Sequence, residues 1–174
     1  MNIIFLDVDG VLNSKNKLTE VYKKTHKPHS GYSYPFDENC LENLKFLIQE
    51  TNSKIVITST WRKEEEGITM LLKVLNEYDL DTKVIGYTPI LNTTRELEIK
   101  KYLSQINYNP NFIILDDDAD FYELMPFLIK TNNQFGLTKE NTKEAIIKLN
   151  KPLTKKYQKK IIIWYNQIKQ TKGR

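Results

Sequence analysis

The sequence contains a single cysteine, Cys40, among its 174 residues. No disulfide can form within the chain, so we expect a reducing, cytoplasmic location. Long apolar runs are missing as well. The longest, such as residues 161–165, fall far short of the roughly 18 residues that a membrane span needs. Asp7 and Asp9 interrupt the first apolar run, so we expect no signal peptide and no membrane partner.

Acidic residues are missing from the last part of the chain. Residues 145–174 contain nine Lys and Arg but no Asp or Glu, although the formal net charge of the whole chain is only +4. Such a basic segment is typical either of a polyanion-binding element or of a solvated helix face, and the sequence leaves both readings open. We predict a core over residues 1–150 and a basic amphipathic helix over 151–174 within the same domain.

The composition is that of a globular protein, and its periodicity alternates between strands and helices. Hydrophobic residues make 40% and charged residues 28%, which excludes disordered and collagen-like classes. Apolar runs predict strands over 2–6, 54–58, 84–86, 112–115 and 128–131. Spacings of three and four residues predict helices after Asp37, over 68–75, from Thr93 with Glu96 as a capping box to Ile106, and after Thr138. We expect a polar loop over 13–35. This alternation predicts an α/β fold, a parallel sheet with helices on both faces.

Polar side chains follow three of the predicted strands at the point where each strand ends. The first strand leads into Asp7 and Asp9, the second into Thr58 and Ser59, and the fourth into residues 116–118, all aspartates. In parallel sheets the functional site lies at the carboxyl ends of the strands, so these groups should meet at one edge. Clustered carboxylates repel one another unless a cation neutralises them, and Mg²⁺ favours such oxygen ligands. The pattern therefore predicts a Mg²⁺ site.

The same segments resemble a known family. Residues 5–13 are similar to the first motif of the haloacid dehalogenase-like (HAD) phosphohydrolases, residues 55–59 to their second and residues 113–117 to their fourth, in family order. The resemblance implies a three-layer Rossmann-like fold. More narrowly, residues 58–62, Arg95 with Glu98 and Ile99, and residues 135–138 resemble the HAD domain associated with RNA-repair multidomain proteins.

The resemblance implies a role for each strand-end residue. Asp7 would be the nucleophile that forms an aspartyl phosphate, and Asp9 the general acid and base. Thr58 would bind a phosphate oxygen, with Ser59 as the alternative if the strand register differs by one. Mg²⁺ would be held by Asp7, the carbonyl of Asp9 and Asp117, with Asp116 in support. Which of Asp116 and Asp117 contacts the metal directly is left open.

The family's third motif is a basic residue that neutralises the phosphate and the nucleophile. We assign it to Arg95, because this residue falls in the first turn of the helix that leads into the fourth strand. Lys100 and Lys101 are the alternatives. Arg62, just after the second strand, is expected as a surface residue that could contact a phosphate.

In the family that these motifs resemble, large insertions after the first or third strand form a cap over the site. Both segments are short here, so the resemblance implies a minimal cap and an open site. An open site favours large substrates, so phosphorylated RNA or DNA ends rank first. Within the 13–35 loop, the lysines with Tyr22, Tyr32 and Tyr34 could contact and stack on such a strand, or could equally form a solvated loop. The alternatives are a small-metabolite or nucleotide phosphatase, a non-catalytic nucleic-acid-binding module, and a receiver-like signalling domain. The oligomeric state is not predicted.

Overall fold

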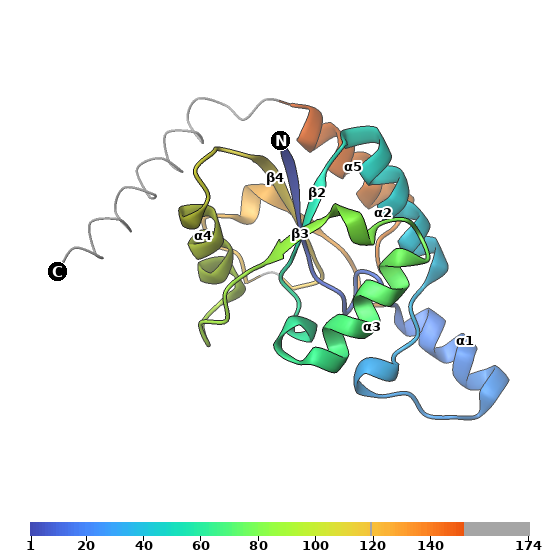
Figure 1. Ribbon diagram of the computed structural model, residues 1–174. Helices are drawn as coiled ribbons and strands as arrows, with labels where there is room; N and C mark the ends of the chain where they lie inside the picture. Colours follow the sequence, from blue (N-terminus) through green and yellow to red (C-terminus); the bar gives the residue numbers. More distant parts are fainter. Residues whose placement is uncertain (119, 152–174) are drawn as a thin grey trace.

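The computed structural model describes residues 1–118 and 120–151, which fold around a five-stranded parallel sheet (Figure 1). The strand order is β3-β2-β1-β4-β5. The strands are β1 (Asn2–Leu6), β2 (Lys54–Ile57), β3 (Val84–Tyr87), β4 (Asn111–Asp116) and β5 (Leu128–Lys130). All five predicted strands are confirmed. The residues of β1, β2 and β4 are almost all buried, as expected for strands in the middle of a sheet that is covered on both faces.

Helices cover both faces of the sheet, which confirms the predicted α/β class (Figure 1). One face packs against α2 (Glu38–Thr51), α3 (Glu65–Asn76) and α5 (Lys139–Asn150). The other packs against α4 (Arg95–Gln105). Side chains of β1 alternate between the two cores, with Ile4 and Leu6 on the first and Ile3 and Phe5 on the second. Because successive side chains point to opposite faces and both faces are covered, an apolar residue is needed at every position of such a strand.

Two of the predicted helix starts are confirmed and one is shifted. Asp37 caps α2, and Thr138 caps α5. The cap of α4 is Thr94 rather than Thr93, because the Thr94 hydroxyl accepts the hydrogen bond from the amide of Leu97. Glu96 completes no capping box. Its carboxylate is buried, where it pairs with Lys100 and accepts hydrogen bonds from main-chain amides of residues 122–124.

The predicted loop over residues 13–35 is wrong, because it contains helix α1 (Lys15–Thr25) and a short 3-10 turn, Gly31–Ser33. None of the α1 residues is buried, so the helix leaves no apolar periodicity in the sequence. Local contacts stabilise it instead: Ser14 caps it, and Lys17 pairs with Glu38 of α2 at 2.6 Å. An antiparallel bridge between Asn13 and Phe36 joins the two ends of this segment. We call the segment the small cap; it lies beside the carboxyl end of β1.

The helix expected over residues 151–174 lies outside the described residues apart from its first position. Within the part of the chain that the structure describes, no helix combines the length and hydrophobicity needed to cross a bilayer.

The loop after β5 packs directly onto the turn that follows β1. The amide of Leu137 donates to the carbonyl of Val11 at 2.9 Å, and the Thr131 hydroxyl donates to the carbonyl of Gly10 at 2.7 Å. Gly136 makes this approach possible, because a Cβ there would overlap Sγ of Cys40 and lie 2.9 Å from the Val11 carbonyl oxygen. Its φ of +67° also favours glycine.

We predict that Gly136→Ala destabilises the protein more than Gly31→Ala. Both glycines have positive φ, so both substitutions cost roughly 1–2 kcal/mol of backbone strain. No atom lies within 4 Å of a Cβ at position 31, whereas position 136 is crowded, which should add about 1–3 kcal/mol. Denaturant unfolding of the two variants measures the difference. Equal losses of stability would contradict the close packing at Gly136.

Candidate active site

The parallel register brings the ends of three strands level at one edge of the sheet. Leu6 pairs with Ile57 of β2 and with Leu115 of β4, so the next residues, Asp7, Thr58 and Asp116, lie side by side. Main-chain hydrogen bonds extend this register by one step, from Asp7 N to Leu115 O at 3.0 Å and from Thr58 N to Leu6 O at 2.9 Å. All three side chains are buried. The predicted convergence at the strand ends is thus present in the structure.

Three carboxylates form a compact cluster at this edge. Oxygens of Asp7, Asp116 and Asp117 all lie within 4.8 Å of one another. Gly10 allows Asp117 to approach, because a Cβ at position 10 would overlap the Asp117 carboxylate. The φ of Gly10 is +69°, so a glycine is required there for the backbone as well as for space. The turn after β1 is therefore shaped around Asp117.

Arg95 supplies a positive charge to this cluster. Its Nη1 lies 2.6 Å from Oδ2 of Asp7 and also bonds Oδ2 of Asp116. Burial lowers the pKa of the guanidinium, but Asp7 and Asp116 outweigh burial, so its pKa lies above the ordinary value. Of the candidates for the third motif, Arg95 is the one that the structure brings to Asp7. Lys100 pairs with Glu96 and Glu123 instead, each at 2.6 Å.

One arginine does not fully compensate three acids. Burial raises the pKa of Asp116, and the neighbouring Asp7 carboxylate raises it further, while Arg95 opposes both effects. Burial and then Asp7 also raise the pKa of Asp117. Burial is the main cause of both shifts, but the close Asp7 carboxylate adds to them, so further positive charge would stabilise the ionised cluster. A hard divalent cation bound by carboxylate oxygens would supply it, so the donor set fits such a metal.

Thr58 and Ser59 follow each other in the chain but have different partners. Among the described residues, the buried Thr58 hydroxyl has no hydrogen-bond partner, and Thr58 lines a cleft together with Arg95 and Asp116. Ser59 Oγ instead accepts from the amide of Trp61, capping the 3-10 turn that follows β2. A buried hydroxyl without a partner is costly. Thr58 is therefore the better placed of the two to bind an incoming oxyanion.

The side chain of Asp9 is not part of the three-carboxylate cluster and is held by two donors. Nε1 of Trp61 donates to one carboxylate oxygen at 2.9 Å, and Nδ2 of Asn13 donates to the other at 2.7 Å. Oδ1 of Asn13 in turn accepts from the amide of Gly10 at 2.9 Å. Sequence reasoning missed Trp61 and Asn13 as site residues. The one available signal was that both fall inside segments that resemble family motifs.

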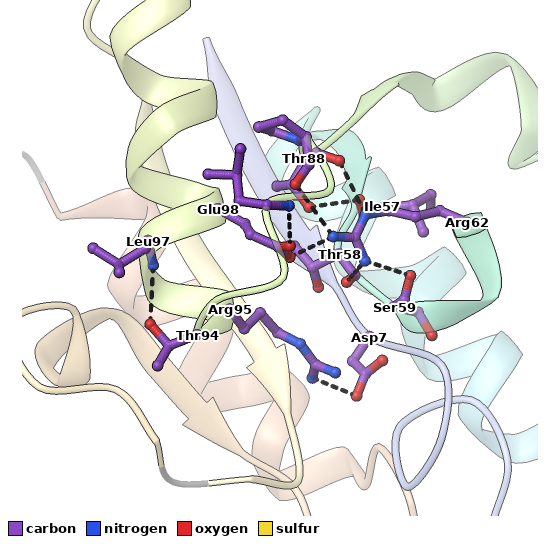
Figure 2. A network of polar contacts seen from close by, with 12 residues as sticks. Asp7, Ile57, Thr58, Ser59, Arg62, Thr88, Thr94, Arg95, Leu97 and Glu98 are labelled. Carbon is purple, nitrogen blue, oxygen red and sulfur yellow. Dashed lines mark hydrogen bonds and ion pairs between the residues drawn. The ribbon is translucent and has the colours of Figure 1, made fainter.

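Arg62 is buried rather than on the surface, which corrects its predicted placement. Its side chain is 2% exposed and pairs with Glu98 of α4, whose side chain is 7% exposed. It also donates to the main-chain carbonyls of Thr58, Ser59 and Thr88 (Figure 2). Glu98 accepts from the amide of Leu91 at 2.9 Å. This network ties the end of β2 and the loop after β3 to the first turn of α4, where Arg95 lies (Figure 2).

The cleft between these elements, which we call the inner cleft, has a volume of about 190 Å³. Thr58, Arg95 and Asp116 line it, and Lys63, Asp118 and Asp120 are among its other lining residues. Sites that enclose a whole small-molecule ligand usually measure roughly 300–1,000 Å³. The inner cleft therefore has room for a compact oxyanion such as a phosphate group, but not for a large ligand.

A comparison with family models gives one match. The model described as the HAD domain in Swiss Army Knife RNA repair proteins matches residues 3–142, a range that includes every site residue described above. No curated protein and no solved structure matches the chain significantly.

We predict that Glu98→Gln destabilises the fold by about 3 kcal/mol, because it leaves the buried Arg62 guanidinium without its counter-charge. As a matched control, Glu20→Gln removes the exposed partner of Lys24 and should leave stability unchanged. Urea unfolding of both variants measures the two effects. A Glu98→Gln protein as stable as the control would show that the Arg62 network does not hold α4 in place.

Proposed function

The chain belongs to the family of HAD domains found in Swiss Army Knife RNA repair proteins, and from this we propose a Mg²⁺-dependent phosphatase that acts on phosphorylated nucleic-acid ends. Family membership supports a HAD-type phosphohydrolase. The metal, the catalytic roles and the substrate are our proposal. The observation that carries it is that Arg95, which contacts Asp7, lines one small cleft together with Thr58, whose hydroxyl has no hydrogen-bond partner among the described residues.

Asp7 is the nucleophile in this proposal. Its carboxylate oxygen attacks phosphorus, and the new bond to Asp7 forms as the bond to the leaving oxygen breaks. Arg95, already in contact with Asp7, neutralises charge on the phosphate oxygens, and the Thr58 hydroxyl donates to one of them. The result is an acyl phosphate on Asp7 and a released alcohol.

Asp9 handles the proton in both steps. As an acid, it protonates the leaving oxygen. As a carboxylate, it then takes a proton from the water that attacks the aspartyl phosphate, which frees Asp7 and inorganic phosphate. The carboxylate must therefore point toward the leaving oxygen rather than at the acid cluster. Trp61 and Asn13 hold it outside that cluster.

The carboxylates of Asp7 and Asp117, with the main-chain carbonyl of Asp9, are the proposed ligands of the metal. Asp116, which already bonds Arg95, supports the site. When bound, Mg²⁺ supplies positive charge for the phosphate oxygens and for the crowded carboxylates. The close spacing of the three carboxylates supports the proposal, and the Asp7 carboxylate contributes to the raised pKa values of Asp116 and Asp117.

Asp7→Asn is expected to lower phosphate release by several orders of magnitude, because the nucleophile and its acid–base partner act together. A panel of phosphorylated RNA and DNA ends, nucleotides and sugars, assayed with Mg²⁺, provides the measurement. Asp81→Asn changes an aspartate ahead of β3, at the opposite edge of the sheet, and should retain full activity. Near-normal turnover by Asp7→Asn would refute the aspartyl-phosphate mechanism.

Removal of the metal should abolish the same activity. We expect a chelator to stop phosphate release and added Mg²⁺ to restore it. Ca²⁺ should support activity poorly, because it takes more ligands at longer distances than this compact cluster offers. Titration of each ion into metal-free protein provides the measurement, and full activity in excess chelator would rule out the proposed metal site.

Trp61→Phe is expected to lower kcat roughly tenfold with little change in KM. It keeps an aromatic ring but removes the indole N–H that positions Asp9. Because Asp9 acts through its proton, the variant should also shift the pH profile of kcat, which a purely structural role of the ring would not do. An unchanged pH profile and an unchanged kcat would show that the Trp61 hydrogen bond does not position the acid.

A further inference from the structure

A second and larger cleft meets the inner cleft at the ends of the strands. We call it the aromatic groove. Its volume is about 630 Å³, and its lining includes Asp9, Asp117, Thr60, Trp61, Tyr32 and Tyr34. Thr60 lines both clefts, and the consecutive Asp116 and Asp117 line one each. The two clefts are therefore neighbours, with one residue of the acid cluster on each side.

The groups of the site divide between the two clefts according to their proposed roles. Thr58 and Arg95, the proposed phosphate contacts, line the inner cleft. Asp9, the proposed acid for the leaving oxygen, lines the aromatic groove instead. The leaving oxygen must lie within hydrogen-bond reach of Asp9. The part of the substrate beyond that oxygen therefore extends into the aromatic groove, an assignment that rests on the proposed function.

The aromatic groove has the side chains that bind a flat, polar ring. Tyr32 and Tyr34 come from the small cap and are partly exposed. The Tyr32 ring is fixed by an edge-to-face contact with Trp61 at 5.1 Å, and it approaches α3 where Gly67 leaves space, since a Cβ there would lie 2.6 Å from the ring. Rigid tyrosines stack on nucleobases with little loss of entropy, and this stacking tolerates any base. The groove volume lies within the range of sites that enclose a drug-sized ligand, so it has room for a nucleoside.

A positive charge lies at the same groove. Lys15, the first residue of α1, lines it and is exposed, and its main chain is anchored by a hydrogen bond from its amide to the carbonyl of Asn133 at 2.9 Å. No ion pair of Lys15 is found within residues 1–118 and 120–151. A lysine beside a base-binding surface suits the phosphodiester of a continuing strand.

We propose that the aromatic groove binds the nucleoside that carries the scissile phosphate, as the terminal nucleotide of a polynucleotide strand. The inner cleft then holds only the phosphate, and Tyr34 and Tyr32 contact the base. Lys15 contacts the backbone of the next nucleotide. Small sugar phosphates lack the flat ring that this surface recognises.

Binding to the Asp7→Asn protein tests the proposal without turnover. Fluorescence anisotropy compares short single strands, labelled at one end and phosphorylated at the other, with an intact or an abasic terminal nucleotide. Strands with a 5′ or a 3′ phosphate are tested in parallel. Loss of the terminal base should weaken binding by about 5- to 100-fold for the preferred end. A phosphorylated mononucleotide should bind more weakly than the strand.

Substitutions assign that difference to the groove. In the Asp7→Asn background, Tyr34→Ala should remove most of the difference between intact and abasic ends, whereas Tyr34→Phe, which keeps the ring, should retain it. Tyr22→Ala is the matched control, because Tyr22 belongs to the same cap but is 51% exposed and does not line the groove. It should behave as the parent protein does.

The possible outcomes separate the groove from the catalytic mechanism. Equal affinity for intact and abasic ends would overturn the groove assignment even if the wild-type protein hydrolyses phosphate esters. Equal affinity for the mononucleotide and the strand would overturn the polynucleotide part. If Tyr34→Ala does not fold, the comparison of intact with abasic ends in the parent and in Tyr34→Phe still decides. A base-dependent affinity without any hydrolysis would support the groove and refute the phosphatase.

Discussion

The repulsion among three clustered carboxylates, two of them buried, is the constraint on which the rest of the site depends. Parallel register places Asp7 and Asp116 side by side, and the turn at Gly10 admits Asp117 to within 4.8 Å of both. Uncompensated acids at this spacing would oppose folding. Arg95 offsets part of the repulsion through direct contacts with Asp7 and Asp116. The remaining deficit of positive charge is what makes the cluster suited to a cation and a phosphate.

The position of Arg95 in turn depends on a buried ion pair that does not touch the acids. Glu98 lies one helical turn after Arg95, and its carboxylate pairs with Arg62 in the loop after β2. Arg62 also donates to the Thr58 carbonyl, so one side chain joins the end of β2, which presents the Thr58 hydroxyl, to α4, which presents the Arg95 guanidinium (Figure 2). The network is thus a structural link between two halves of the phosphate-binding cleft.

The small cap extends the site on the other side of the strand ends. Its helix α1 buries none of its residues, so its role is not to complete the core. The cap instead places Tyr32 and Tyr34 at the edge of the sheet where Trp61 holds Asp9. The phosphate chemistry is proposed for the inner cleft, which is lined by Thr58 and Asp116 at the strand ends. Recognition of the leaving group is proposed for the aromatic groove, which depends on the cap.

The sequence by itself determined the parallel sheet and the residues at its edge, because apolar strands and strand-end acids are local patterns, and parallel register then aligns Asp7, Thr58 and Asp116. Tertiary structure alone decided what periodicity does not encode. Helix α1 has no buried residue, so the sequence there carries no apolar periodicity. Trp61 reaches Asp9 and Arg62 reaches Glu98 across 52 and 36 positions of the chain. Such contacts depend on how loops from separate strands pack at the sheet edge, and no local sequence pattern predicts that packing.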